Sequence, residues 1–372
     1  MKTNAAVLRS APSEWQVEEV ELDEPRRGEV LVEMVATGLC HSDDHVSHGD
    51  VQVGYLPVVG GHEGSGIVRA VGTEVHDLEV GDHVLTSFVP ACGRCRWCAM
   101  GMQNLCDVGA LTLIGHQLDG TFRMHTADGL DIATIALLGT FSEWQVYDQR
   151  SLIKIDKDIP LEVACLVACG VQTGYGSATT AGNVQPGDVV IVAGVGGIGM
   201  NAVQGAVASG AAHIIAVDPV PDKQKWALEF GATESFPSLA DATPRVQALT
   251  NGQGADVTIL TAGVVHNDLI TAGYHSIRKA GTLVVTGVGP DQEDGLRGIN
   301  AYDMAMFQKR IQGALYGMKS PLEAMPMLLN QYRSGKLKLD ELVTRTYSLD
   351  QINTAYDDMR NGRNIRGVIR FR

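Results

Sequence analysis

Positive charge is scarce in this sequence of 372 residues. It contains 29 lysines and arginines against 43 aspartates and glutamates, and its formal net charge is −14. This balance argues against a nucleic-acid partner, because phosphate binding needs clustered Lys and Arg. The N-terminus lacks the apolar run of a signal peptide, since Arg9, Glu14, Glu18 and Glu19 interrupt the first twenty residues. We therefore expect a cytoplasmic protein with reduced thiols.

Charge is missing altogether between Val189 and Val217, and this stretch is long enough to suggest a membrane span. Its six glycines argue otherwise, because four of them crowd into the segment Gly194–Gly199. A strand, a glycine turn and a buried helix explain the stretch better. We expect no membrane contact.

The length of the chain favours two domains. Residues 1 to about 165 contain strand-like runs between glycines and prolines, including Val30–Val35, Gly66–Val71 and His83–Ser87. From about residue 170 to 310, apolar runs such as Val189–Ala193 and Ile214–Val217 alternate with helical stretches. This alternation predicts an α/β fold with a parallel sheet that helices cover on both faces.

Four of the seven cysteines fall within fifteen residues, at Cys92, Cys95, Cys98 and Cys106. The spacing C-x2-C-x2-C-x7-C lets four thiolates meet at one tetrahedral point, which is how structural zinc is held without an open position. Two disulfides are the alternative, but they suit a short secreted chain better than a long acidic one with an odd cysteine count. We predict a structural-zinc lobe at about residues 90–107 that does no chemistry.

A glycine-rich turn follows the strand-like run Val189–Ala193. Its residues are Gly194, Val195, Gly196, Gly197, Ile198 and Gly199. They fit the pattern G-x-G-x-x-G, and the next apolar run ends at Asp218, nineteen residues past Gly199. In this context the pattern predicts a Rossmann site, with the pyrophosphate at the helix N-terminus and Asp218 on the adenosine ribose. Asp218 would repel a 2′-phosphate, which favours NAD over NADP. An ordinary turn with Asp218 as a helix cap remains the alternative.

Three further groups carry a family resemblance: Cys40–His45, Gly61-His62-Glu63 with its following glycines, and Cys169–Gly174. The second group matches the signature G-H-E-x-x-G-x5-G-x2-V at every fixed position. Together with the cysteine lobe and the glycine motif, these groups make the chain resemble the zinc-dependent medium-chain alcohol dehydrogenases over essentially its whole length. The resemblance is to their long-loop branch, and most of all to actinobacterial enzymes of the nicotinoprotein type, which retain NAD.

The resemblance implies a catalytic zinc bound by Cys40, His62 and Cys169, so that each chain would hold two zinc ions. One open position would take an alcohol, lower the pKa of its hydroxyl, and let the hydride pass to the nicotinamide. Cys165 lies four residues before Cys169 but lacks the family context. We interpret it as a buried core thiol.

The resemblance also implies roles for residues around this zinc. Asp43 would orient His62, and Glu63 would be the acidic residue near the metal, although a purely structural Glu63 remains open. Ser42 would take the proton of the alcohol and pass it, through the cofactor ribose, to His45 at the surface.

Four more residues are assigned to the cofactor by the same resemblance. Thr173 would touch the nicotinamide side of the cofactor, Arg366 would approach the pyrophosphate, and Lys223 would be a further cofactor-binding residue. His41 stands where many family members have an arginine against the pyrophosphate. Because histidine is charged only part of the time, we expect that contact to be weaker here.

The resemblance also implies that the substrate would be a small alcohol or aldehyde. The loop after Cys106 is similar to that of the thiol-adduct formaldehyde dehydrogenases, which use an arginine early in the loop. This chain has no lysine or arginine between Cys106 and Arg123, so we favour simple alcohols and keep the thiol adduct as the alternative. A nucleic-acid-binding zinc ribbon and a zinc-less reductase are weaker alternatives.

The resemblance implies two domains: a β-rich GroES-like catalytic domain at residues 1–170 and 311–372, and a doubly wound Rossmann domain at residues 171–310. The substrate would sit in the cleft between them. Residues Ile311–Tyr316 look like the edge strand through which the family extends its cofactor sheet across a two-fold axis. A homodimer, or a homotetramer of dimers, is therefore expected.

Overall fold

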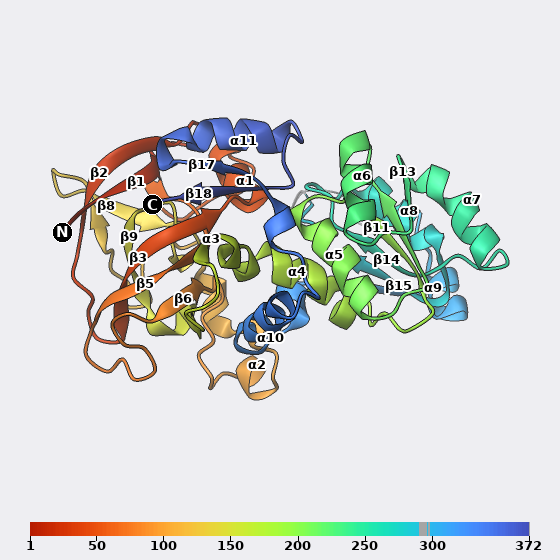
Figure 1. Cartoon of the computed structure of the whole chain (residues 1–372), viewed down its shortest axis with the longest axis horizontal. Helices are drawn as coiled ribbons and strands as arrows, with labels where there is room; N and C mark the ends of the chain where they lie inside the picture. Colours follow the sequence, from red (N-terminus) through yellow and green to blue (C-terminus); the bar gives the residue numbers. More distant parts are fainter. Residues whose placement is uncertain (290–295, 297, 372) are drawn as a thin grey trace. The chain divides into compact units, whose positions relative to one another are not determined.

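The computed structural model describes residues 1–289, 296 and 298–371 (Figure 1). The chain forms two compact units, one of residues Met1–Cys169 and Ser320–Arg372 and the other of residues Gly170–Lys319. The second boundary lies between Lys319 and Ser320, later than the predicted boundary after residue 310. The reason is that strand β16 (Arg310–Gly313) pairs with the parallel sheet and so belongs to the cofactor unit.

The first unit contains a closed barrel and a second, larger sheet. The barrel strands, in spatial order, are β1 (Lys2–Leu8), β2 (Gln16–Leu22), β7 (Met124–His125), β8 (Asp131–Thr134) and β4 (Val58–Val59). The strands of the larger sheet, in order, are β10 (Leu152–Ile155), β6 (His83–Thr86), β5 (Glu63–Val71), β3 (Glu29–Gly38), β18 (Arg366–Arg370) and β17 (Val343–Tyr347), with β9 (Trp144–Asp148) also paired to β3. The predicted strands near residues 30, 66 and 83 are present.

Short helices connect these strands. They are α1 (His41–His48), α2 (Arg96–Ala99), α3 (Leu161–Ala164), α10 (Pro321–Arg333) and α11 (Ile352–Arg360). Helix α11 buries Ile352, Ala355 and Tyr356 in the core of the unit. The ring of Tyr356 contacts Phe141, whose ring also meets Trp15 edge-on at 5.7 Å between centroids.

The C-terminal strand returns to the centre of the larger sheet. β18 pairs antiparallel with β3, and Val368 lies opposite Gly38. β3 also pairs with β5, and there Gly38 lies opposite Glu63. This register brings Arg366, at the start of β18, beside the beginning of β5, although the two segments are about 300 residues apart.

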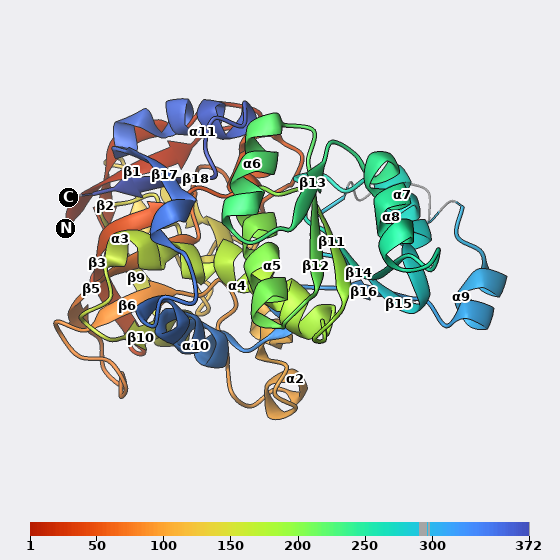
Figure 2. The same ribbon diagram turned by 45° about the vertical axis from the view of Figure 1, so that its right-hand side comes forward.

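The second unit is a six-stranded parallel sheet. Its strands, in spatial order, are β13 (Glu234–Phe236), β12 (His213–Val217), β11 (Val189–Ala193), β14 (Ala255–Leu260), β15 (Ile277–Val285) and β16. Its helices are α4 (Gly170–Gly176), α5 (Gly197–Ala208), α6 (Pro221–Glu229), α7 (Leu239–Leu249), α8 (Asn267–Ser276) and α9 (Ala301–Phe307). α5 and α6 cover one face of the sheet, and α7 and α8 cover the other (Figure 2). The predicted doubly wound Rossmann sheet is therefore confirmed.

The strand order of this sheet decides where a ligand can bind. The chain starts in the middle at β11, runs outward through β12 and β13, and then crosses to β14 on the other side of β11. Dinucleotides bind at such a reversal, outside the carboxyl ends of the strands. The uncharged stretch in the sequence is β11, the glycine turn, α5 and β12. Among the described residues, no helix is long and apolar enough to cross a membrane.

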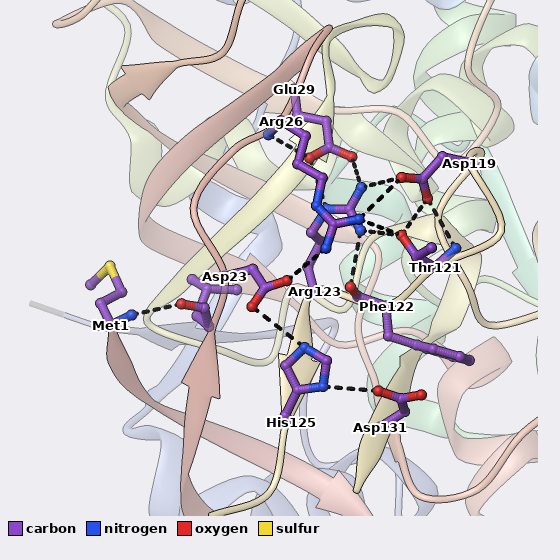
Figure 3. Close-up of polar contacts among 11 residues, drawn as sticks. Met1, Asp23, Arg26, Glu29, Asp119, Thr121, Phe122, Arg123, His125 and Asp131 are labelled. Carbon is purple, nitrogen blue, oxygen red and sulfur yellow. Dashed lines mark hydrogen bonds and ion pairs between the residues drawn. The ribbon is translucent and has the colours of Figure 1, made fainter. Parts of the chain in front are cut away.

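A buried ion pair anchors the long loop of the first unit (Figure 3). Arg123 is 1% exposed, and its guanidinium donates to both carboxylate oxygens of Glu29, at 2.5 and 2.8 Å. Asp119 accepts a further bond from Arg123 at 2.6 Å. Although partial burial opposes it, hydrogen bonds from Thr121 and Arg123 lower the pKa of Asp119 to about 2. The ion pair between Arg123 and Glu29 thus holds the loop at the start of β3.

Candidate active site and metal centres

Three distant segments meet at one buried cluster in the first unit. Cys40 immediately precedes α1, and His62 immediately precedes β5. Cys169 immediately precedes α4 and belongs to the first unit. One ligand atom from each of them, and one from Glu63, lie within 4.8 Å of one another. Two sulfurs, an imidazole and a carboxylate form a donor set that suits zinc.

His62 lies beside Asp43, the residue that the family resemblance assigns to orienting its ring. Its Nδ1 lies 3.0 Å from Oδ2 of Asp43, whose side chain is completely buried, while Oδ1 of Asp43 accepts the backbone N–H of Gly61 at 2.8 Å. Burial opposes charge on the ring, but the carboxylate of Asp43 raises the pKa of His62 well above its usual value. With Nδ1 engaged in this way, Nε2 is the nitrogen left for a metal.

The two cysteines of the cluster interact with each other. Contact with Cys169 lowers the pKa of Cys40 well below its ordinary value, and contact with Cys40 raises that of Cys169. Cys165, in contrast, is fully buried, lies outside the cluster and donates to the carbonyl of Glu162 at 3.4 Å. Burial raises the pKa of its thiol. The geometry agrees with the interpretation of Cys165 as a core thiol.

Glu63 lies between the cluster and Arg366. Nη2 of Arg366 contacts Oε2 of Glu63 and donates to the carbonyl of Leu39 at 3.0 Å. Burial raises the pKa of Glu63 to about 7, although Arg366 acts in the opposite sense. The sequence prediction assigned Arg366 to the pyrophosphate only, and it missed this buried pair. Contact of Arg366 with the cofactor remains a prediction.

Helix α1 carries the predicted proton-relay residues. Oγ of Ser42 lies 3.6 Å from Sγ of Cys40, so this hydroxyl is next to the metal cluster. One turn further along, Nδ1 of His45 lies 2.9 Å from Oδ2 of Asp50. His41 is the exposed first residue of the same helix.

One residue near the cluster had no signal in the sequence. The ring of Phe88 meets the imidazole of His62 edge-on, with 5.8 Å between centroids. Phe88 follows β6, and only the pairing of β6 with β5 brings it there. A lone phenylalanine after a short strand carries no pattern that could have indicated this contact.

The four-cysteine lobe has the dimensions of a tetrahedral zinc site. The Sγ atoms of Cys92 and Cys98 are 3.9 Å apart, and those of Cys95 and Cys106 are 4.0 Å apart. A tetrahedron with Zn–S bonds of about 2.3 Å has edges of about 3.8 Å. All seven cysteines are free thiols, so the disulfide alternative is not realised.

Backbone N–H groups favour the thiolate form of Cys92 and Cys95, whereas burial raises the pKa of Cys98 and Cys106. The N–H of Cys95 points at Sγ of Cys92 at 3.4 Å, and the N–H of Cys98 points at Sγ of Cys95 at 3.5 Å. Hydrogen bonds from the backbone of Arg94 and Cys95 lower the pKa of Cys92 to about 6. A cation at the centre would neutralise the charge that these bonds favour.

Substituting Cys98 tests this second site separately from catalysis. Cys98 is buried, and its thiolate would complete the tetrahedron. We expect Cys98→Ser to lower bound zinc by about one ion per chain and to expose the lobe to proteolysis, because structural zinc binding is coupled to local folding. Metal analysis and limited proteolysis measure both effects. Unchanged zinc content would contradict the assignment.

The glycine turn of the second unit has the geometry of a dinucleotide cradle. Gly194 has φ +93°, and a Cβ on Gly199 would lie 2.0 Å from the carbonyl oxygen of Gly194, so neither position tolerates a side chain. At Gly196 no atom of the described residues lies within 4 Å of such a Cβ. Protein packing therefore does not require this glycine, whereas in a dinucleotide site a glycine here lets the protein backbone approach the pyrophosphate. Gly197 and Ile198 begin α5, which has no side-chain cap.

Three more of the predicted cofactor residues, Asp218, Lys223 and Thr173, lie in this unit. Asp218 follows β12, and its carboxylate accepts the N–H groups of Val195 at 3.0 Å and Val220 at 2.9 Å. Lys223 is half-buried in the first turn of α6, and Thr173 is buried in α4. The structure therefore brings Asp218 to the glycine turn.

Two family models match the chain. Residues 26–157 match the alcohol dehydrogenase GroES-like domain, and residues 197–331 match the zinc-binding dehydrogenase model. Fold and site together define a zinc-binding dehydrogenase.

Similar proteins specify the family. The NDMA-dependent alcohol dehydrogenase of Amycolatopsis methanolica is 48% identical over 99% of both chains. Among solved structures, an alcohol dehydrogenase zinc-binding domain protein from Burkholderia ambifaria is 33% identical, with a TM-score of 0.93 over 100% of this chain and 99% of that one. Benzyl alcohol dehydrogenase from Acinetobacter calcoaceticus is 29% identical, with a TM-score of 0.92 over 100% of both chains. The chain belongs to the zinc-dependent medium-chain alcohol dehydrogenases, a family of zinc- and nicotinamide-dependent oxidoreductases, and the prediction from its motifs is confirmed.

Proposed function

We propose that this protein oxidises primary or secondary alcohols to aldehydes or ketones, and catalyses the reverse reaction, with NAD as the hydride acceptor. The observation that carries the proposal is the buried set of Cys40, His62 and Cys169, with Asp43 behind the imidazole. Because Glu63, the fourth donor of the cluster, is paired with Arg366, three protein ligands and one open position are left, as is typical of catalytic rather than structural zinc.

Each residue of the site has a distinct role in the proposed reaction. Zinc bound by Cys40, His62 and Cys169 would supply Lewis-acid chemistry that lowers the pKa of a substrate hydroxyl. Asp43 keeps the His62 ring in the orientation that offers Nε2 to the metal. Ser42, 3.6 Å from the Cys40 sulfur, accepts the substrate proton at Oγ, and His45 delivers a proton to solvent. Phe88 places an apolar ring beside His62.

The test is alcohol-dependent reduction of the nicotinamide, followed by its absorbance. Added NAD is reduced if the cofactor dissociates, and up to one bound nucleotide per chain is reduced if the cofactor is retained. Benzyl alcohol belongs among the substrates, because a relative of the same fold acts on it by name. The proposal predicts turnover that is lost on chelation and restored by zinc. Absence of alcohol-dependent reduction with zinc-loaded protein would overturn the proposal.

The preference for NAD over NADP is proposed from Asp218. Both of its oxygens accept backbone N–H groups, so the carboxylate is held in place while each oxygen keeps a lone pair for a ribose hydroxyl. We expect Asp218→Arg to raise the NADP-to-NAD ratio of binding affinities, measured by reloading nucleotide-free protein, by at least about tenfold, because a repelling charge becomes an attracting one. Asp222→Arg, an exposed change on α6, is the control. An unchanged ratio would remove Asp218 from the ribose.

We further propose that NAD stays bound between turnovers. The resemblance to retaining enzymes and the NDMA-dependent relative support this idea. Denaturing the purified protein and assaying the released nucleotide tests it directly. A retaining enzyme releases close to one nucleotide per chain, whereas an ordinary dissociating enzyme releases almost none.

A thiol-adduct formaldehyde dehydrogenase is the second candidate. Such an enzyme needs a free cation in the loop after the cysteine lobe. The loop has no lysine or arginine before Arg123, and the guanidinium of Arg123 is buried against Glu29 and Asp119 (Figure 3). This favours simple alcohols. Formaldehyde turnover that depends on an added thiol would reverse the ranking.

Assembly and location are part of the proposal. β16 lies at the end of the strand order, where an edge strand can pair with its copy across a two-fold axis. This supports a homodimer, or a homotetramer of dimers. Free cysteines throughout the chain support a reducing cytoplasmic location.

A further inference from the structure

The end of helix α1 presents a carboxylate to His45. The helix ends at Gly49, whose φ of +82° only glycine adopts without strain, and the chain then turns back on itself. As a result, the backbone N–H of Asp50 donates to the carbonyl of His45 at 2.9 Å. The side chain follows, and Oδ2 of Asp50 lies 2.9 Å from Nδ1 of His45. Two contacts therefore hold Asp50 against the same residue.

Asp50 is the carboxylate that His45 pairs with, because the neighbouring acid is engaged elsewhere. Asp44 is buried and pairs with Arg360 at 2.7 Å. His48, on the next turn, also contacts Asp44, through its carbonyl at 2.9 Å and its carboxylate at 3.5 Å. The pair of His45 and Asp50 is therefore separate from the contacts that Asp44 makes with Arg360 and His48.

The chemistry of the pair decides which ring nitrogen of His45 is protonated. An ionised carboxylate only accepts hydrogen bonds, so Nδ1 must carry the hydrogen. In the neutral ring, Nε2 then has a lone pair and can accept a proton. An imidazole without such a partner prefers its hydrogen on Nε2 and cannot accept there.

We propose that Asp50 is a positioning residue for proton release, which holds His45 in the Nδ1–H form so that Nε2 accepts the proton leaving the active site. The inference rests on the proposed alcohol oxidation, in which His45 delivers the proton to solvent. One proton binds at Nε2, the Nδ1–H bond to Asp50 persists in the imidazolium, and the Nε2 proton then passes to water. The carboxylate also offsets the positive charge while the ring holds both protons.

Asp50→Asn tests the proposal with little change in volume. We expect the single-turnover rate of hydride transfer from alcohol to fall about tenfold, a part of the 10²–10⁴-fold that a positioned acid–base group contributes. KM for the alcohol should stay close to the wild-type value, because Asp50 touches no substrate. Asp50→Glu should recover part of the rate, since it restores a carboxylate.

The chain contains a matched control for this substitution. His125 and Asp131 form a pair of the same geometry, with Nδ1 and Oδ1 2.9 Å apart and similar exposure (Figure 3). That pair lies on β7 and β8, in the barrel rather than on α1. Asp131→Asn should therefore leave hydride transfer unchanged.

A spectroscopic readout separates positioning from general damage. Nitrogen chemical shifts of labelled histidine rings report the tautomer, and comparison with His45→Gln identifies the His45 signals. We expect the Nδ1–H form in the wild type and a shift toward Nε2–H in Asp50→Asn.

The outcomes separate this inference from the proposed function. The inference is supported if hydride transfer is slowed equally in Asp50→Asn and in His45→Gln, and if the double variant is no slower than either. A slow His45→Gln with normal Asp50→Asn overturns the role of Asp50 and leaves the relay. Normal rates in both overturn the relay through His45 without touching the zinc assignment. If the wild type oxidises no alcohol, the proposed function is wrong. The tautomer measurement still decides whether Asp50 positions the His45 ring.

Discussion

Cys169→Ser is expected to abolish alcohol oxidation while the fold survives. A neutral serine hydroxyl replaces a thiolate in the open donor set, so the catalytic zinc loses one of its three proposed ligands. Zinc contributes several kcal/mol of transition-state stabilisation, and kcat/KM should fall by at least about 10³-fold. Steady-state kinetics and zinc content measure the effect together, and bound zinc should fall while the four-cysteine lobe keeps its own ion.

Cys165→Ser is the matched control for this prediction. It makes the same change four residues earlier, at a buried thiol outside the cluster. We expect this variant to keep its zinc and most of its activity, with at most a modest loss of stability. If the two variants lost activity equally, Cys169 would have no special role, and the assignment of the catalytic site would fall.

The second large effect concerns stability. Arg123→Met removes a guanidinium that is 1% exposed and leaves the carboxylate of Glu29 buried without its partner. Breaking one side of a buried ion pair costs about 3–5 kcal/mol, because the remaining charge stays desolvated. The urea midpoint of unfolding, measured on the zinc-loaded protein, should fall accordingly.

Two further variants isolate the cause. Arg26→Met removes a half-exposed arginine from the same group of contacts (Figure 3), and it should cost less than about 1 kcal/mol. Combining Arg123→Met with Glu29→Leu replaces the whole pair by apolar side chains and should recover much of the loss. A large loss in Arg26→Met, or no recovery in the double variant, would contradict the buried-charge explanation.

Local patterns account for what the sequence could predict. Cys92, Cys95, Cys98 and Cys106 lie within one short loop, so their spacing alone limits how their sulfurs can meet. The glycine turn is equally local, since the close approach of Gly199 to Gly194 involves residues five apart. The parallel sheet could be predicted because its strands are buried on both faces and read as continuous apolar runs.

Ion pairs between residues far apart in the sequence could not be predicted from such local patterns. Arg123 meets Glu29 across 94 positions, and Arg366 meets Glu63 across 303. Their positions follow from strand register, above all the pairing of β18 and β5 on either side of β3. Register depends on how whole faces of a sheet pack, and no short pattern carries that information. For this reason the sequence prediction assigned Arg366 to the cofactor alone.

Motifs in the sequence were sufficient to predict the family and the two kinds of unit, and the short spacing of its cysteines predicted the four-cysteine lobe. The proposed catalytic ligands Cys40, His62 and Cys169 lie far apart in the chain, so only the family resemblance indicated them. The tertiary structure alone decided which buried charges pair, where Phe88 stands beside His62, and how Asp50 turns back on His45. These depend on long-range packing and on the left-handed turn at Gly49, where a glycine in the sequence permits the turn but does not show what the turn brings together.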